Sequence, residues 1–341
     1  MRVDILEESR KADWDRFVDT NPNVIAWHSY YYSSVLKKMY NLPFYPLAAY
    51  DGSALCGILP LYLSDTFRRG RILMSVPYFV AGGIVAMNQE AEQLLLKRAI
   101  ELGKETSAAH IALRQYKIKI QGELLTDDSY YNRELALTED LAQIWKSISD
   151  TNRSKVEEAK KHSTVLEYPS SDLDTFYKLL LHDQHGQGLP CVSRRWVELL
   201  LGTGTYQIAL LRQQGTLVAA TLAKCFKDTV SFPLTCLPRH DEQGELFAYD
   251  LYWKLITNLA GEGVHIFHSG RIPQGDVAPS YRLGWGGTKC TYYYQSPGVA
   301  KSQAQQTNTR GAKRSLFESV WKKTPLSLAK TLGPVIVKQF P

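Results

Sequence analysis

A helical repeat of apolar residues dominates residues 246–260 and predicts a largely buried helix. Its apolar positions lie four residues apart, at Phe247, Leu251, Leu255 and Leu259. A short apolar run at 264–267 predicts a strand, which leads into the polar segment 268–271, His-Ser-Gly-Arg. Because α/β proteins commonly bind ligands where strands end, the stretch 246–294 is the predicted site of chemistry.

The same order of elements is predicted twice along the chain. In the first half, the pattern predicts a hairpin of strands at 44–50 and 54–62, a strand at 72–76, a helix at 90–104 and a strand at 110–114. In the second half, strands at 206–212, 216–226 and 230–236 precede the helix at 246–260 and the strand at 264–267. The predicted fold class is therefore α/β (α+β), with two copies of one unit, each a mixed, mostly antiparallel sheet flanked by helices.

The length of the chain and this repeat predict two domains and a tail. A chain of 341 residues exceeds what a single core usually holds, and a hydrophobic content of 44% is enough for two cores. The expected segments are a first domain at 1–150, a second domain at 151–297 and a basic tail at 298–341.

The positive charge of the chain is concentrated in that tail. The net charge is +6, yet residues 298–341 contain eight Lys and Arg against one acid, Glu318, so the rest of the chain is close to neutral. This distribution argues against a DNA-binding body. Residues 298–313 are predicted to be a linker. The basic and apolar residues 314–341 fit either an anionic membrane surface or packing on the second domain, with RNA contact as a third option.

Other features of the sequence predict a cytoplasmic protein, at most peripheral at the inner face of the membrane. The first residues lack an apolar signal core, and no run approaches the roughly 20 apolar residues that span a bilayer. The five cysteines have no metal-binding spacing, and no metal site is predicted.

The stretch 246–294 resembles the C-terminal signature of the FemAB-like, GNAT-related acyltransferases, including those encoded with exopolysaccharide systems. The resemblance rests on the run GVHIFHSGR, on the loop SYRLGWGG and on the aromatic strand that follows them. Arg271, Trp285 and Gly286 keep the family pattern, whereas His268 stands where an acid is usual and Arg282 lies near the usual lysine. The resemblance implies two tandem GNAT-like domains. It also implies N-acyl transfer, of an acyl or aminoacyl group, to an amine of a cell-envelope or exopolysaccharide precursor.

Such a transfer needs a proton acceptor for the amine and donors for the carbonyl oxygen. His268 is a candidate proton acceptor because imidazole titrates near neutral pH, and the alternative is a histidine hydrogen-bonded at a strand end. Asp250 lies within an apolar helix, where its carboxylate must face a cleft or meet a partner such as Arg271. Tyr281 is the candidate proton donor to the leaving group, and solvation of its Gly/Pro-rich loop is the alternative.

The candidate substrate-binding residues come from four segments of the chain. They are Arg271, Arg282 and Trp285 in the signature, Tyr78 and His28 in the first domain, and Arg153 and Lys155 after the expected helix cap Asn152. Arginine and lysine side chains can bind phosphate or another anion. The resemblance implies that the tracts around Tyr78 and His28 line an acceptor groove. Packing at these two residues and solvation of the helix at Arg153 are the structural alternatives.

The identity of the acyl donor stays open at this stage. No bound cofactor is expected, and the donor is either acyl-CoA or aminoacyl-tRNA, because no clean Q/R-x-x-G-x-G/A turn is found. The acceptor would be a small-molecule or lipid-linked sugar, and tRNA would be a partner only as a donor. The alternative function is a non-catalytic binding protein that keeps the fold but lacks the family's acid at 268 and its lysine near 282.

Overall fold

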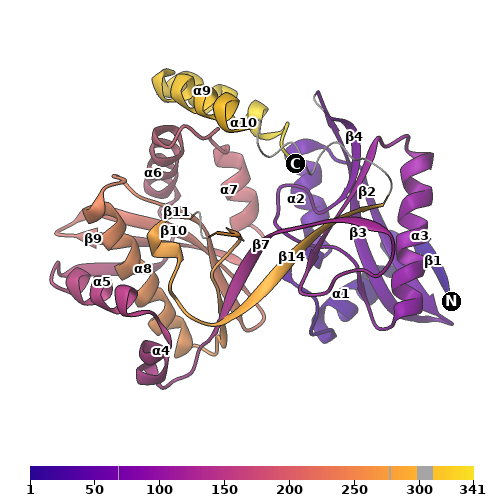
Figure 1. Cartoon of the computed structure of the whole chain (residues 1–341), viewed down its shortest axis with the longest axis horizontal. Coiled ribbons are helices and arrows are strands. Elements are labelled where there is room, and N and C mark those ends of the chain that lie inside the picture. The colour runs from indigo at the N-terminus through magenta and orange to yellow at the C-terminus, as the bar shows by residue number, and fades with distance from the viewer. Residues whose placement is uncertain (68, 276–277, 298–309) are drawn as a thin grey trace. The chain divides into compact units, whose positions relative to one another are not determined.

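The computed structural model describes residues 1–67, 69–275, 278–297 and 310–341, with backbone only for 310–316 (Figure 1). Its contacts divide the chain into two compact units. Unit 1 contains residues 1–130, the strand residues 291–297 and Val335–Pro341, and unit 2 contains Tyr131–Cys290 and residues 310–334. Each unit is described by itself below.

Unit 1 is built on a mixed sheet with helices on both faces. Its strands, in order across the sheet, are β1 (Arg2–Ile5), β2 (Phe44–Asp51), β3 (Ala54–Thr66), β4 (Gly70–Ser75), β6 (His110–Tyr116) and the end of β14 (Thr288–Pro297), and β5 (Val85–Ala86) pairs with β3. Its helices are α1 (Lys11–Thr20), α2 (Tyr31–Tyr40) and α3 (Gln89–Glu105), with 3-10 turns η1 (Glu8–Arg10) and η2 (Ala26–His28). Neighbours in this order are antiparallel, except that β4 and β6 are parallel.

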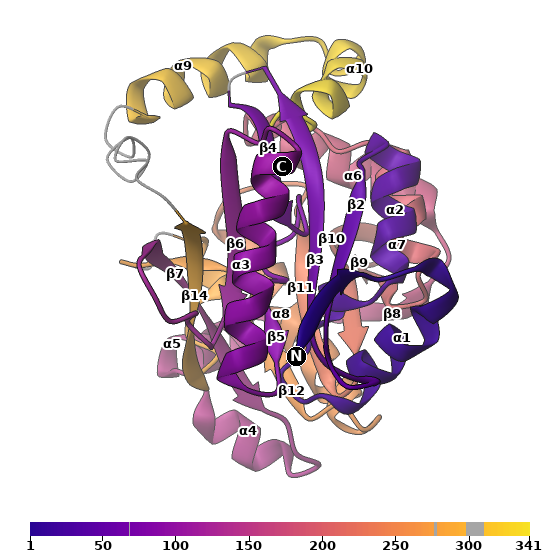
Figure 2. The same ribbon diagram turned by 90° about the vertical axis from the view of Figure 1, so that its right-hand side faces the viewer.

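Helix α3 lies along one face of this sheet (Figure 2). Asn88 caps it by accepting the Ala91 N–H at 2.9 Å, and its leucines Leu95 and Leu102 are buried. The other face carries aromatic side chains from α1 and β2, with the rings of Trp14 and Phe44 6.5 Å apart. Apolar residues on both faces of the central strands therefore build the core of unit 1.

Unit 2 repeats this architecture. Its strands, in order, are β8 (Thr164–Ser170), β9 (Tyr206–Gln213), β10 (Thr216–Phe226), β11 (Thr229–Cys236), β12 (Ile266–His268) and the end of β7 (Leu124–Ala136). Neighbours are again antiparallel, except that β11 and β12 are parallel. Its other elements are α4 (Leu141–Ser147), α5 (Asp150–Lys160), α6 (Leu173–Gly186), α7 (Arg194–Leu201), α8 (Glu242–Ala260), β13 (Ile272–Pro273) and η3 (Ser280–Arg282). The matching strand order and orientation confirm the predicted fold class.

Helix α8 is the central helix of unit 2, as its apolar repeat predicts. It extends four residues further toward the N-terminus than the predicted 246–260, because Asp241 caps it by accepting the Gly244 N–H at 2.8 Å. Phe247, Leu251 and Leu255 are buried against the sheet. The neighbouring strand is observed at Ile266–His268 rather than at 264–267.

The bounds of the units differ from the expected domains 1–150 and 151–297. Strand β7 follows β6 in sequence, yet its end pairs with β12 in unit 2. Strand β14 follows the unit 2 elements, yet residues 292–295 pair with β6 in unit 1. Each sheet is therefore completed by a strand from the sequence of the other half, which moves the division of the chain to Tyr130 and Cys290. Strand β7 is not predicted from the sequence, because its residues are mostly polar.

The predicted cap of the α5 helix is wrong by three residues. Ser149, not Asn152, is the N-cap, and its hydroxyl accepts the Asn152 N–H at 3.2 Å. The buried Asn152 side chain instead donates to the Leu283 carbonyl at 2.8 Å. This amide therefore joins α5 to the signature loop, a tertiary contact that the local pattern does not encode.

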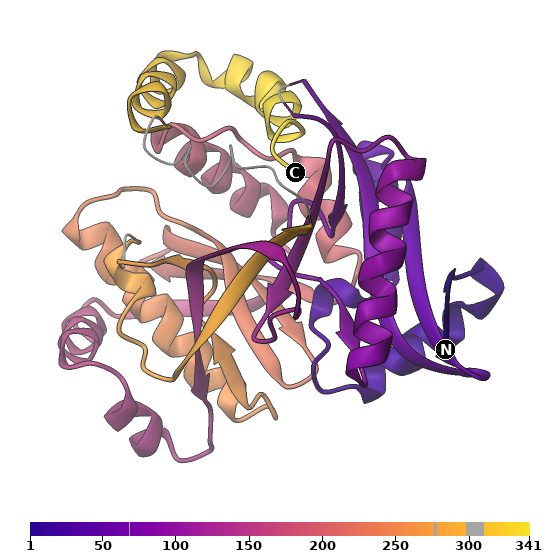
Figure 3. The ribbon, with the colours of Figure 1, turned by 45° about the vertical axis from the view of Figure 1, so that its right-hand side comes forward.

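The tail forms two helices, α9 (Arg310–Lys323) and α10 (Leu326–Val337). Within unit 2, α9 lies beside α6 (Figure 3), and His185 Nε2 is 2.8 Å from the Thr324 carbonyl oxygen. Residues 298–309 of the expected linker lie outside the described residues, and the chain is helical from Arg310 onward. Among the residues that the structure describes, no helix is both long and apolar enough to cross a membrane.

Candidate functional site

The predicted site lies in unit 2 where β12 ends. Strand β12 pairs with Thr229–Ser231 of β11 in parallel and stops at His268, while β11 continues from Phe232 to Cys236. The polar residues 268–271 therefore follow the end of β12, beside the part of β11 that extends beyond its pairing with β12. This is the position at which α/β sheets commonly bind ligands.

His268 is half-buried, and its ring is oriented by its own loop. The Gly270 N–H donates to Nδ1 at 3.1 Å. Because Nδ1 accepts this hydrogen bond, the hydrogen of the neutral ring is on Nε2. His268 is thus arranged as a donor through Nε2, and acceptance of a proton at Nδ1 requires loss of the Gly270 contact.

Ser269 holds the start of this loop against β7. Its N–H donates to the Arg133 carbonyl at 3.0 Å, and its hydroxyl oxygen accepts the Arg133 N–H at 3.0 Å. The same hydroxyl donates to Asn132 Oδ1 at 3.2 Å, and both side chains are buried. These three contacts fix the backbone on which His268 and Gly270 are placed.

Arg282 brings the two parts of the signature together. Its Nη2 donates to the Arg271 carbonyl at 3.3 Å. It also lies so close to Gly270 that an added Cβ there would be 2.8 Å from Nη2, and the φ of Gly270 is +83°. The positive φ favours glycine at 270, whereas the arginine side chain could move away from an added Cβ. The guanidinium of Arg282 therefore lies beside the strand exit, next to the backbone of Arg271.

Tyr281 and Trp285 form the buried support of the loop. Trp285 Nε1 donates to the Tyr281 carbonyl at 2.7 Å, and its ring packs 5.8 Å from that of Tyr252 and 6.3 Å from that of Phe267. Burial raises the pKa of Tyr281 well above its ordinary value. The phenol is thus protonated at physiological pH, and Trp285, which is 1% exposed, acts as a packing residue.

Two glycines of the run LGWGG allow the loop to approach other backbone segments. A Cβ at Gly284 would lie 2.5 Å from Asn152 Oδ1, and one at Gly286 would lie 2.3 Å from the Ser147 carbonyl oxygen. Both glycines have positive φ, +76° and +77°. Because neither position can accept a side chain, these glycines set the contact between the loop and the α4–α5 segment.

The partner expected for Asp250 is wrong. Its carboxylate is fully buried and lies 3.4 Å from Lys254 Nζ, with the Thr164 hydroxyl also bonded to Oδ2. It does not pair with Arg271. Lys254 in turn donates to the Thr164 carbonyl at 2.6 Å. Asp250 thus belongs to a network between α8 and β8, and a catalytic role for it stays a prediction.

Arg153 and Lys155 are engaged within their own segment. Arg153 Nη1 donates to the carbonyls of Ile148 and Trp145, at 2.5 and 3.2 Å, and Nη2 meets Asp150. These contacts satisfy the carbonyl end of α4, a common use of arginine at a helix C-terminus. Lys155 pairs with Glu158 at 3.2 Å on the exposed side of α5. Binding of an anionic substrate by either residue stays a prediction.

Tyr78 and His28 lie in unit 1. The Tyr78 hydroxyl donates to the Lys338 carbonyl at 3.0 Å, and burial raises its pKa to about 12. His28 is buried, with Nδ1 accepting the Ile25 N–H at 3.1 Å and Nε2 3.0 Å from the Gly83 carbonyl oxygen. Both ring nitrogens thus have backbone partners, as in the packing alternative, and substrate contact at these residues stays a prediction.

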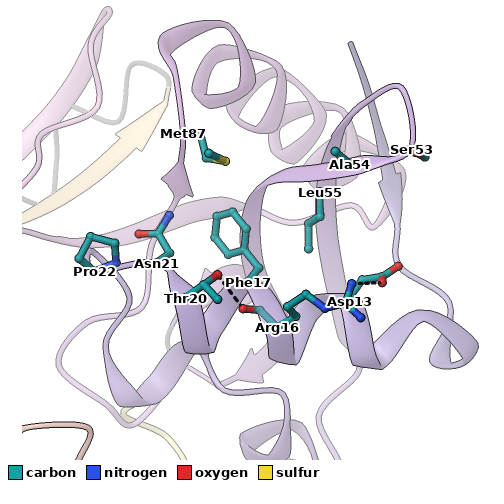
Figure 4. Close-up of a pocket in the computed structure, with 10 residues that line it drawn as sticks. All are labelled: Asp13, Arg16, Phe17, Thr20, Asn21, Pro22, Ser53, Ala54, Leu55 and Met87. Atoms are coloured by element: carbon teal, nitrogen blue, oxygen red, sulfur yellow. Dashed lines mark hydrogen bonds and ion pairs between the residues drawn. The ribbon is translucent and has the colours of Figure 1, made fainter.

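A cavity of about 390 Å³ in unit 1 contains none of the predicted site residues (Figure 4). It lies between α1 and the β2–β3 turn, and its charged lining residues are Asp13 and Arg16, whose side chains lie 3.5 Å apart. Asp13 also pairs with Arg10 at 2.8 Å. His28 lines a much smaller cavity of about 40 Å³ in the same unit. Within the described ranges, no group of three or more His, Cys, Asp or Glu side chains is arranged to hold a metal ion.

One pair between α6 and the segment that follows β11 was not predicted. His240 Nε2 lies 2.8 Å from Asp183 Oδ1, and Asp183 is buried on α6. The sequence contains a signal for Asp183, because Phe176, Leu180 and Asp183 share one helical face and an acid on an apolar face needs a partner. Nothing local points to His240 as that partner.

No family model matches the chain, and no curated protein matches its sequence. Solved structures do match. A crystal structure of FemX superposes with a TM-score of 0.66 at 13% identity, covering 86% of this chain and 97% of that chain. The C-terminal domain of a putative lysylphosphatidylglycerol synthetase from Agrobacterium fabrum has a TM-score of 0.55 at 12% identity, with 92% and 95% coverage. L-PGS from Bacillus licheniformis has a TM-score of 0.52 at 10% identity, with 85% and 91% coverage.

The chain has the fold of FemX. This finding confirms the fold implied by the FemAB-like resemblance, with the two repeated units described above. The structural neighbours include proteins named as a putative lysylphosphatidylglycerol synthetase and as L-PGS. At 10–13% identity the similarity shows the fold alone.

Proposed function

We propose that this protein transfers an acyl or aminoacyl group to an amine of a cell-envelope or exopolysaccharide precursor. The observation that carries the proposal is the polar loop at the exit of β12, in a chain that has the FemX fold over 86% of its length. The two lysylphosphatidylglycerol synthetase structures support an aminoacyl donor by their names. The donor is therefore aminoacyl-tRNA or acyl-CoA, and no bound cofactor enters the proposal.

In this reaction the amine attacks the carbonyl carbon of the donor. A C–N bond forms, the C–O or C–S bond to the leaving group breaks, and the carbonyl oxygen becomes transiently anionic. His268 is suited to donate to this oxygen, since its Nδ1 accepts the Gly270 N–H and its hydrogen is on Nε2. Tyr281, whose phenol is protonated at physiological pH, is the proposed proton donor to the leaving group.

Arg271 and Arg282 are the proposed contacts to the anionic part of a substrate. The Arg271 side chain is exposed at the loop, and that of Arg282 lies beside Gly270. Guanidinium groups bind phosphate and carboxylate in a bidentate manner. The proposed acceptor is a small-molecule or lipid-linked sugar bearing an amine. Reaction at the cytoplasmic side, with peripheral contact to the inner face of the membrane, completes the proposal.

The test combines the full chain with acetyl-CoA, a long-chain acyl-CoA or labelled aminoacyl-tRNA and with amine-bearing sugar nucleotides, and detects the amide by mass spectrometry. We expect His268→Ala and Arg271→Ala to lower kcat/KM by about 10²–10³-fold, as loss of an oxyanion donor or a substrate clamp does. His268→Gln retains a donor and should lose less. Arg195→Ala removes an exposed arginine on α7 and serves as the control.

The outcomes separate two functions. Wild-type turnover in both His268→Ala and Arg271→Ala would contradict the site assignment. Saturable binding of one of the donors with no product from the wild-type chain would instead support the alternative, a binding protein that keeps the fold without catalysis. The retained glycines at 270 and 284 fit either outcome, because both positions hold the loop in place.

A further inference from the structure

His240, which is partly exposed, and the buried acid Asp183 form a pair at the end of β11. His240 lies between β11 and α8, and its side chain is 40% exposed, whereas the Asp183 side chain is 3% exposed. The carboxylate also accepts the Leu237 N–H at 2.9 Å and the Gln187 Nε2–H at 2.7 Å. Asp183 is therefore held by three donors, two from the segment after β11 and one from the end of α6, and its carboxylate fixes the orientation of the imidazole.

This arrangement selects one tautomer of His240. A carboxylate only accepts, so the ring hydrogen is on Nε2, which faces Asp183. The lone pair of the neutral ring is then on Nδ1. His240 and His268 share this tautomer, but at His268 the Gly270 N–H occupies Nδ1. In His240 the nitrogen that faces Asp183 is Nε2, so Nδ1 is the nitrogen that can accept a proton.

The pair lies at the end of β11, the strand that runs parallel to β12. The Leu237 N–H that donates to Asp183 follows β11 directly, and because β11 and β12 are parallel, His240 follows the end of β11 and His268 ends β12 at the same edge of the unit 2 sheet. The Tyr252 hydroxyl lies 2.9 Å from the Thr235 hydroxyl near the end of β11, and the Tyr252 ring lies 5.7 Å from that of Tyr281. Tyr252 therefore connects the end of β11 with η3, where Tyr281 precedes Arg282.

We propose that His240, oriented by Asp183, accepts the proton of the acceptor amine. The inference rests on the proposed acyl transfer. An ammonium group gives one proton to His240 Nδ1, and the neutral amine then attacks the carbonyl carbon. The new C–N bond forms as the bond to the donor oxygen or sulfur breaks, the second proton passes to that leaving group, and the exposed imidazole releases its proton to water. His240 is the catalytic residue in this step, and Asp183 is its positioning residue.

A structural role alone makes different predictions. In that role the pair would only hold residues 237–241 at the start of α8, and substitution would change stability without changing the pH dependence of turnover. The charged and titratable groups around the pair are Asp183 on α6 and the flanking residues Arg239 and Asp241, together with Cys236 at the end of β11 and Tyr281 on η3, which interact electrostatically with Asp183. The test therefore needs a pH profile as well as a rate.

The experiment compares His240→Gln with the wild-type chain, using the donor and amine that give product in the test above. Glutamine can still donate to Asp183 but cannot accept a proton, so the fold is retained. We expect kcat to fall by about 10²-fold or more with little change in KM. We also expect the increase of kcat with pH that comes from deprotonation of a histidine to disappear. Asp183→Asn should lower kcat less than His240→Gln does and should change the same part of the pH profile of kcat. His182→Gln removes an exposed histidine on α6 and should behave as wild type.

A second measurement uses the unmodified protein and does not depend on turnover. Long-range ¹H–¹⁵N spectra of the labelled full chain report the tautomer of each histidine, and we expect hydrogen on Nε2 of His240. Hydrogen on Nδ1, or wild-type kcat and pH profile in His240→Gln, overturns the proposal while acyl transfer stands. Absence of product from the wild-type chain with every donor refutes the proposed function, and this inference with it.

Discussion

Lys224 is a buried base on β10, opposite Ser231 of β11, which is itself opposite His268. Paired residues of neighbouring strands share a face, so Lys224 and His268 lie on the same side of the unit 2 sheet. Burial lowers the pKa of Lys224 from 10.5 to about 7. The sequence offers a signal for it, a single lysine in the apolar run TLVAATLAKCF.

Replacement of Lys224 by methionine should stabilise unit 2 near neutral pH. Between pH 7 and 10.5 the unfolded chain binds more protons than the native chain, so the free energy of unfolding rises with pH in this range. The destabilisation of the native state by Lys224 is therefore greatest below about pH 7 and decreases as the pH rises toward 10.5. We expect Lys224→Met to gain ~4 kcal/mol at pH 7, since a tenfold change in proton affinity corresponds to ~1.4 kcal/mol. Urea unfolding at several pH values measures the gain, and Lys178→Met, at an exposed site on α6, is the control. A gain that stays constant from pH 7 to 10 would contradict the assignment.

At the scale of elements, the tail helices both pack and expose an apolar face. Trp321 and Ala329 are buried, and Gly333 lies so close to the backbone of Cys191 that a Cβ would be 2.6 Å from its carbonyl oxygen. Phe317, Val320, Leu328, Leu332 and Val335 are exposed beside the exposed lysines of α9 and α10. The two alternatives from the sequence, packing and a membrane-facing surface, are thus compatible, because they use different faces.

We expect this exposed face to bind anionic vesicles. Lys322→Glu with Lys323→Glu should weaken sedimentation with phosphatidylglycerol vesicles at least ~10-fold at low salt, since each basic residue near such a surface contributes about 1 kcal/mol. Lys97→Glu with Lys104→Glu makes the same charge change on exposed positions of α3 and is the matched control. Equal loss of binding in both double variants would show general attraction to charge, and no binding by the wild-type chain would contradict the membrane contact.

Substitution is a cleaner test than truncation after Pro297, because truncation also exposes the surface that Trp321 covers.

At the scale of the whole molecule, unit 1 depends on a strand from near the end of the sequence. Gln295 on β14 is 1% exposed and clamps Ile120, accepting its N–H at 2.8 Å and donating to its carbonyl at 3.0 Å. Gln295→Leu leaves both buried backbone groups of Ile120 without this partner. We expect a loss of about 2 kcal/mol in the free energy of unfolding, measured by denaturant titration, with the exposed Gln121→Leu as control. Similar stability of the two variants would show that β14 is not held in this way.

Much of the fold follows from local patterns, whereas the site follows from them only in part. The strand at 216–226 is observed at the predicted bounds and the helix at 90–104 within one residue of them, because helical and alternating periods are properties of neighbouring residues. Arg271, Arg282 and Trp285 lie in the segment that carries the resemblance, where Arg282 donates to the Arg271 carbonyl, and their binding roles stay predictions. Asp250 is the informative failure: its apolar helix predicts a buried carboxylate correctly, but the partner is Lys254, one helical turn away, rather than Arg271.

The amino-acid sequence by itself determined the α/β class, the repeat of one unit and the position of the polar strand exit, since these depend on periodicity, turn residues and motif spacing. Only the tertiary structure decided that β7 and β14 complete the sheets, that Asn152 joins α5 to the signature loop and that Asp183 orients His240. The physical reason is the range of the interactions. A hydrophobic period acts between neighbours in the sequence, whereas strand pairing and a buried acid select their partners by packing between segments that are far apart along the chain.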